Sequence, residues 1–139
     1  MARRNANDGI SLIQTAEGGL NEIGNILSRL RELSIQGASD TIGNTERGFL
    51  NKEFSQLKDE INRISKITEF NGTLLLVGNQ DNIDEEIKKR SNTFPLEIQV
   101  GKNYFETADS KENPNPTNII RIDFSNVNAT VNEDGLNLG

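Results

Sequence analysis

The sequence predicts a mainly α-helical chain with a β-hairpin: two long antiparallel helices, a short strand, and then a two-stranded hairpin. Residues 5–38 and 45–70 carry apolar side chains at alternating spacings of three and four, which is the pattern of helices packed along a seam. Residues 96–101 and 119–125 instead alternate apolar and polar side chains, which is typical of half-buried strands.

The amino-acid composition excludes several classes of protein. Only 33% of the 139 residues are apolar, whereas ordinary domains reach roughly 45–50% on a count that includes glycine. We therefore expect an elongated shape, or one part of a larger assembly, rather than a thick core. The net charge of −6 argues against nucleic acid and anionic membranes as partners. No run of ~18 apolar residues occurs, so the sequence predicts no membrane insertion.

The first helix is predicted over residues 5–38. Six apolar residues share one narrow face at about 100° per residue and form the expected seam: Ile13, Ala16, Leu20, Ile23, Leu27 and Leu30. A second stripe, displaced to one side, runs through Leu12, Ile26 and Leu33. Two stripes imply two neighbours, of which the second helix of the chain is one.

The second helix, residues 45–70, has the most regular apolar pattern in the chain. Its seam follows spacings of four and three without a break: Leu50, Phe54, Leu57, Ile61, Ile64 and Thr68. Because the connection between the two helices is short, they are expected to pack antiparallel.

The remaining chain is predicted to be β-structure and irregular segments. Residues 74–77 form a short apolar strand, residues 79–93 a charged loop, and residues 96–101 and 119–125 the hairpin strands. Two prolines between the hairpin strands exclude a central strand there. The tail, residues 126–139, is rich in asparagine and glycine and is expected to be irregular.

Residues for catalysis are scarce. The chain has no histidine and no cysteine, which removes the commonest general base and the thiol nucleophile. The carboxylates Asp84, Glu85 and Glu86 adjoin a basic run, as in a solvated segment, and they lack the spacing and central glycine of a calcium loop. The sequence predicts no enzyme, no metal site and no cofactor.

A contact site is the remaining possibility. Arg29, Leu33 and Gln36 share one face at spacings of four and three, with Leu33 at the edge of the apolar stripe. An apolar side chain flanked by an arginine and an amide is typical of interface anchors. The alternative is an ordinary amphipathic surface with one scattered leucine.

Several motifs, in order, resemble the rod domain of bacterial flagellin. The start of the rod is matched by ANDGISLIQTAEG (residues 6–18) and LNEI (20–23), and its most recognisable stretch by RLRELSIQ (29–36). The end of its second helix is matched by EINRIS (60–65) and TEFNG (68–72), and a hairpin strand by LEIQVG (96–101). The likeness is close over residues 2–77 and weaker beyond.

This resemblance implies an architecture and a function. Residues 1–139 would be the N-terminal half of the flagellin rod, beginning inside its first helix and lacking its C-terminal helix, so that Leu12 and Ile26 would line a groove for that helix. The function would be that of a structural subunit of the extracellular flagellar filament, exported without a cleaved signal peptide and assembling with other flagellin subunits for motility.

The resemblance also implies host recognition. In many flagellins the same helix surface is recognised by the innate Toll-like flagellin receptor, and the residues of that site match Arg29, Leu33, Gln36 and Glu53 here. The same residues would also be placed to contact the next subunit along the filament. Two other classes remain open: a hook–filament junction protein, and a coiled-coil adaptor or secretion chaperone, which we expect to be entirely helical.

Overall fold

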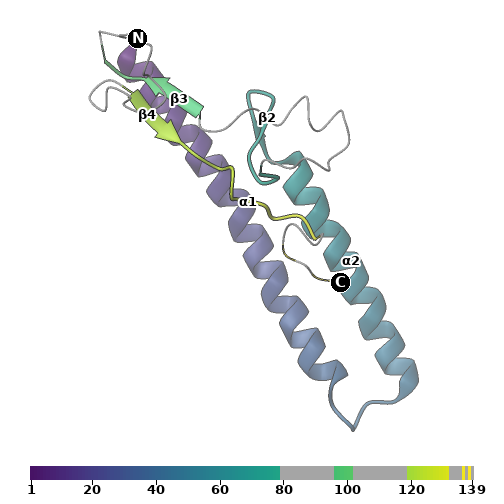
Figure 1. Cartoon of the computed structure of the whole chain (residues 1–139). Coiled ribbons are helices and arrows are strands. Elements are labelled where there is room, and N and C mark those ends of the chain that lie inside the picture. Colours follow the sequence, from purple (N-terminus) through teal and green to yellow (C-terminus); the bar gives the residue numbers. More distant parts are fainter. Residues whose placement is uncertain (79–95, 102–118, 132–135, 137, 139) are drawn as a thin grey trace.

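The computed structural model of the chain describes residues 1–78, 96–101, 119–131, 136 and 138. Its elements follow in the order α1 (Ala2–Gly37), α2 (Asn44–Ile67), β1 (Glu69–Phe70), β2 (Thr73–Leu74), β3 (Leu96–Gln99) and β4 (Ile119–Ile122). Figure 1 shows α1 and α2 side by side in opposite directions, with the β3–β4 pair lying near the start of α1. The mainly helical fold predicted from the sequence is confirmed, and its long helix pair is elongated rather than compact.

The connection between the helices is held by a side chain from the second helix. Helix α1 has no basic residue in its own last turn, where cations stabilise the exposed carbonyl groups. Arg47, in the first turns of α2, donates from Nε to the Gly37 carbonyl at 3.1 Å and from Nη2 to the Ser39 carbonyl at 3.3 Å. This arginine therefore caps α1 from across the turn and supports the antiparallel arrangement.

Helix α2 ends three residues earlier than the sequence predicts. Thr68 is extended, with φ −70° and ψ 102°, and β1 then pairs with β2 through Glu69 opposite Leu74 and Phe70 opposite Thr73. The intervening Asn71 and Gly72 both have positive φ, 51° and 80°, as a tight two-residue hairpin requires. The expectation of helix through residue 70 is wrong because this hairpin turns the chain back.

The buried face of α1 differs from the expected seam. Its residues lie three, four or seven positions apart and include two glycines: Gly9, Leu12, Ala16, Gly19, Ile23, Leu30 and Leu33. Ile13 and Leu20, which we expected in the seam, are 47% and 40% exposed, and Leu27 is only partly buried. The physical reason is that side chains from other segments pack directly on the backbone of α1 at these glycines: a Cβ on Gly19 would lie 2.8 Å from Thr68 Oγ1.

The expected groove for a further helix is also closed at Leu12. This side chain is only 6% exposed, because the β3–β4 pair covers this end of α1. A Cβ on the nearby Gly9 would lie 2.8 Å from Ile98 Cδ1 and 3.8 Å from Ile122 Cδ1. Ile26, the other expected groove residue, is partly buried against the core. Neither residue therefore lines a groove along α1, although Leu12 lies at the floor of an open pocket between α1, the β1–β2 turn and β3.

The seam of α2 is best packed near its end. Ile61 and Ile64 are buried, whereas Leu50, Phe54, Leu57 and Thr68 are half-buried. The deepest packing occurs where the apolar run from Leu74 to Val77 lies against this end, with every side chain in it at most 1% exposed.

That apolar run is mostly not a strand, contrary to expectation. Only Leu74 belongs to β2, and Val77 forms a single antiparallel bridge with Asn128. The Leu76 carbonyl accepts a hydrogen bond of 2.8 Å from the Ala129 amide. The start of the tail has no regular element, as expected, yet Ala129 and Thr130 are buried, so it contributes to the core.

Strands β3 and β4 pair antiparallel, from Leu96 opposite Ile122 to Gln99 opposite Ile119. They are four residues each, shorter than the predicted ranges. The predicted charged loop, residues 79–93, and most of the segment between the two strands lie outside the described residues. In the described part of the chain, neither helix is apolar enough to cross a membrane.

Candidate functional site

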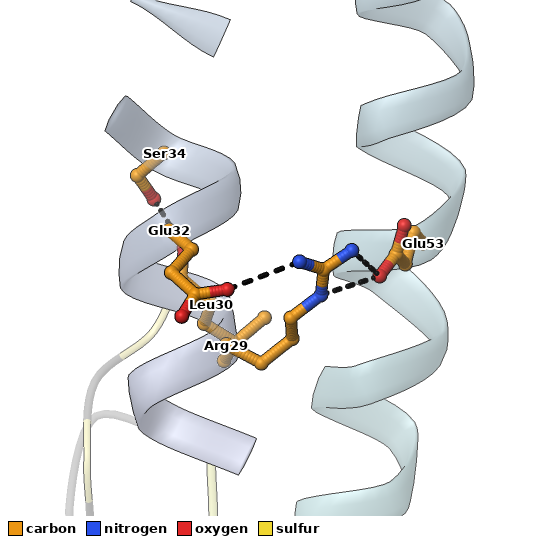
Figure 2. A network of polar contacts seen from close by, with 5 residues as sticks. All are labelled: Arg29, Leu30, Glu32, Ser34 and Glu53. Carbon is orange, nitrogen blue, oxygen red and sulfur yellow. Dashed lines mark hydrogen bonds and ion pairs between the residues drawn. The ribbon is translucent and has the colours of Figure 1, made fainter. Parts of the chain in front are cut away.

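The site centres on an arginine that bridges two carboxylates. Arg29, on α1, donates from Nε to Glu53 Oε1 on α2 at 2.8 Å, and its Nη2 lies 2.8 Å from the same oxygen. Its Nη1 also contacts Glu32 Oε2 at 3.0 Å, one turn further along α1. Figure 2 shows the guanidinium lying between the two helices, with a carboxylate on either side.

The electrostatics of the cluster keep the guanidinium charged and oriented. The hydrogen bond to Glu53, and then that to Glu32, raise the pKa of Arg29 above its ordinary value. The side chains of Arg29 and Glu53 are 45% and 42% exposed, so solvent screens the pair and it adds little to the stability of the fold. The main effect of the pair is to fix the positions of the two side chains. It holds an arginine and a carboxylate from different helices on one accessible surface.

The same edge of the helix pair carries further charges. On α2, Arg63 pairs with Glu60 through an Nε–Oε2 hydrogen bond of 2.8 Å, and this bond lowers the pKa of Glu60. The charge of Glu22, on α1, acts on Arg63 across the helix pair. Gln36, two turns beyond Arg29 on the same face, is exposed. We name the set Arg29, Gln36 and Glu53 the contact surface.

Leu33 does not lie on that surface. It is only 2% exposed, and it lines a small pocket between the helices with Gly37, Leu50 and Phe54. Its place in the three-and-four repeat through Ile26 and Leu30 directs it toward α2. The expectation that Leu33 sits at an accessible boundary is therefore wrong, and its role is to support the helix pair beneath the contact surface.

Glu32 also belongs to the Arg29 site, and the sequence did not lead us to expect it. Glu32 contacts the guanidinium of Arg29, and the spacing of three between them on a helix is a signal that could have identified it. Glu53, by contrast, is grouped with Arg29 by the resemblance, and the structure places it beside α1.

The structure offers little for catalysis. An open pocket lies between α1, the β1–β2 turn and β3, and its polar lining includes Asn5, Asp8, Asn71 and Glu97. Among the described residues, no three histidine, cysteine, aspartate or glutamate side chains gather as metal ligands would.

Residues 1–81 match the model of a protein family described as the bacterial flagellin N-terminal helical region. The chain belongs to the bacterial flagellin family. The matched range contains both long helices and every residue of the contact surface, so the resemblance seen in the motifs of residues 2–77 is confirmed.

Individual flagellins agree with the family match. The chain is 52% identical to flagellin B of Vibrio anguillarum over 82 residues, 59% of this chain and 22% of that protein. It is 41% identical to phase 2 flagellin of Salmonella typhimurium over 138 residues, 99% of this chain and 22% of that protein. This flagellin chain therefore spans about a fifth of the length of these curated relatives.

A solved flagellin structure has the same fold. The crystal structure of Bacillus cereus flagellin superposes with a TM-score of 0.63 at 29% identity, covering 89% of this chain and 58% of that chain. At this coverage the structural likeness is not confined to the two long helices, α1 (Ala2–Gly37) and α2 (Asn44–Ile67).

Proposed function

We propose that this chain is part of a structural subunit of the bacterial flagellar filament. Its place would be the N-terminal half of the rod domain, outside the cell, in contact with other flagellin subunits. The observation that carries the proposal is the family match over residues 1–81, which includes both long helices. The elongated antiparallel pair suits a filament, because long parallel rods offer continuous lateral surfaces to their neighbours.

The contact surface is proposed to be where the rod meets a partner. Arginine is enriched at protein interfaces, and a pre-oriented guanidinium loses less freedom when it binds. Arg29 is held by Glu53 and Glu32 while remaining 45% exposed, so it is both ordered and accessible. Leu33, packed beneath, keeps α1 and α2 at the spacing that brings Arg29 and Glu53 together.

Two partners suit this surface, and we propose that it serves both. One is the neighbouring flagellin subunit, whose contact would have to complement a cluster of two carboxylates and one guanidinium. The other is the innate Toll-like flagellin receptor of the host. Because one surface cannot bind both at once, we expect receptor binding by free subunits and not by those within a filament.

The filament role is tested by exchange of segments. The matching 138-residue segment of Salmonella typhimurium phase 2 flagellin is replaced by this chain, and the chimera is expressed in cells that lack flagellin. We expect secreted chimera, filaments visible by electron microscopy, and swimming. The unaltered phase 2 flagellin is the control. A chimera that is secreted and folded but forms no filament would contradict the proposal.

A further inference from the structure

The turn between β1 and β2 consists of an asparagine followed by a glycine, Asn71 and Gly72. An asparagine in this position loses its side-chain amide by a reaction within the chain. The backbone nitrogen of the next residue attacks the asparagine Cγ, the Cγ–nitrogen bond of the amide breaks, and ammonia leaves with the proton of the attacking nitrogen. Glycine favours this step because it has no Cβ to obstruct its own nitrogen. The product is a five-membered succinimide ring.

Water then opens the succinimide ring at one of its two carbonyl carbons. Opening at one carbonyl leaves an aspartate, and opening at the other leaves an isoaspartate, in which the main chain runs through the former side chain. The overall reaction consumes one water molecule and releases one ammonia molecule, and it needs no other reactant.

The structure leaves both residues of this turn accessible. Asn71 and Gly72 are exposed, and a Cβ built on Gly72 would meet nothing within 4 Å. Within the part of the chain that the structure describes, the Asn71 side chain forms no hydrogen bond. The Asn71 Cγ is therefore free to rotate about its side-chain bonds and is open to water.

The hairpin around the turn is short. Strands β1 and β2 have two residues each and pair only with one another, and a hairpin of this kind is marginally stable in water. Attack by the Gly72 nitrogen requires the Asn71 backbone to rotate out of its turn conformation, in which φ is 51°. Local openings of this size cost far less free energy than global unfolding, so the turn slows the reaction without preventing it.

A second pair in the chain has similar chemistry but a different environment. Asp8 and Gly9 could form the same ring with loss of water, yet both lie within α1. The helix holds the Gly9 nitrogen in its hydrogen-bond ladder, and Gly9 is buried beneath Ile98. The fold therefore protects Asp8 and leaves Asn71 open to reaction.

We propose that Asn71 is a site of spontaneous deamidation in the folded chain, and that its isoaspartate product opens the β1–β2 hairpin. Isoaspartate lengthens the main chain of a two-residue loop, whose register sets Phe70 opposite Thr73. Both products also add a carboxylate to the open pocket that Asn71 lines together with Asp8 and Glu97, and like charges repel. The proposal concerns the chemistry of the turn and is independent of the filament role.

The site is tested by ageing the 139-residue chain at mildly alkaline pH and mapping its peptides by mass spectrometry. We expect Asn71 to convert at a rate within about tenfold of that in a free peptide of residues 66–76. Isoaspartate, assayed with an isoaspartyl methyltransferase, should form at Asn71 and not at Asp8. The control is Asn71→Gly, because two glycines suit the same turn and leave no amide to lose.

The effect on the hairpin is tested by hydrogen exchange. The Leu75 amide donates to the Thr68 carbonyl at 3.2 Å, just beyond the β1–β2 pair, and should exchange at least about tenfold faster in the isoaspartate form. Asn71→Asp has the carboxylate without the longer main chain and should exchange more slowly than that form. An unchanged Asn71 in the folded chain, while the free peptide converts, overturns the proposal. Aspartate without isoaspartate, or equal exchange at Leu75 in the isoaspartate and unmodified chains, also overturns it.

Discussion

Arg29 and Glu53 join the two long helices at their solvent-exposed edge, with Arg29 Nε and Nη2 both 2.8 Å from a single Glu53 oxygen. The residues are 24 positions apart in the chain, and the helical turn between them brings them together. Because each is more than two-fifths exposed, the pair is a feature of the surface more than of the core.

Loss of the Arg29 guanidinium should weaken binding to a partner. Arg29→Ala removes the bridging cation and leaves Glu32 and Glu53 unneutralised. In a calorimetric titration with the ectodomain of the Toll-like flagellin receptor, we expect affinity to fall about tenfold or more, as at arginine hot spots. Lys66→Ala, which removes an exposed cation at the end of α2, is the control. Equal affinity of wild type and Arg29→Ala would exclude this residue from the receptor site.

Loss of the Leu33 side chain should lower stability. This side chain is 2% exposed between α1 and α2, so Leu33→Ala leaves a cavity and should reduce the free energy of unfolding by about 2–5 kcal/mol. Urea unfolding followed by circular dichroism measures the change. Ile10→Ala, at a residue that is 54% exposed, is the control and should change stability by less than about 0.5 kcal/mol. Equal effects of the two changes would contradict the packing described for Leu33.

Two adjacent glycines should respond in opposite directions to alanine. Gly18 has nothing within 4 Å of an added Cβ, so Gly18→Ala should stabilise α1 by up to about 1 kcal/mol through helix propensity. At Gly19 the added Cβ would lie 2.8 Å from Thr68 Oγ1 and 2.9 Å from Leu76 Cδ1. Gly19→Ala should therefore destabilise the chain by about 1–3 kcal/mol through overpacking. Thermal unfolding of the two variants side by side tests the prediction, and stabilisation by both would refute the close contact at Gly19.

Acid should weaken the fold through its hydrogen-bonded carboxylates. The Arg63 guanidinium lowers the pKa of Glu60 below its ordinary value of 4.5, and the Ser125 hydroxyl and amide lower the pKa of Asp123. A carboxyl group whose pKa is lower in the folded state stabilises the fold above its unfolded pKa, and the effect is lost as pH falls through the folded pKa. The melting temperature should therefore hold from pH 7 to about pH 5 and decline below about pH 4.5.

The control for this pH dependence is Glu60→Gln, which removes one of the two groups. Its melting temperature should be lower than that of the wild type at pH 7 and should converge on it near pH 3. The difference should be small, and added salt should reduce it, because Glu60 and Arg63 are exposed. A constant difference across the whole pH range would show that the Glu60 charge is not its cause.

The helices themselves could be predicted from local pattern. Helix α1 begins three residues before the predicted start and ends one residue before the predicted end, and α2 begins one residue before its predicted start. Periodicity succeeds here because each helix satisfies its own backbone hydrogen bonds and shows its apolar side chains at a fixed angular interval. The resemblance to flagellin grouped Arg29 with Glu53 in one site, but only the structure showed the ion pair between them.

The choice between neighbouring stripes on α1 was decided only by the tertiary structure. Sequence alone favoured Ile13 and Leu20, because their side chains are large and apolar, and it did not predict that the buried face passes through Gly9 and Gly19. In the folded chain the β3–β4 pair and the Leu74–Val77 run lie directly against the two glycines, so the buried face passes through them. The hydrophobicity of the side chains on α1 does not record where other segments pack directly on its backbone, and those segments lie far along the chain.

The same reasoning applies to Leu33 and to the run from Leu74 to Val77. The sequence determined that both are apolar and, for Leu33, which helix carries it. That Leu33 is covered by α2, and that Val77 and Leu76 are joined to Asn128 and Ala129, depends on residues roughly 20 to 50 positions away. Local pattern specified the two helices of this flagellin chain, and long-range packing decided which of their faces remain exposed for contact.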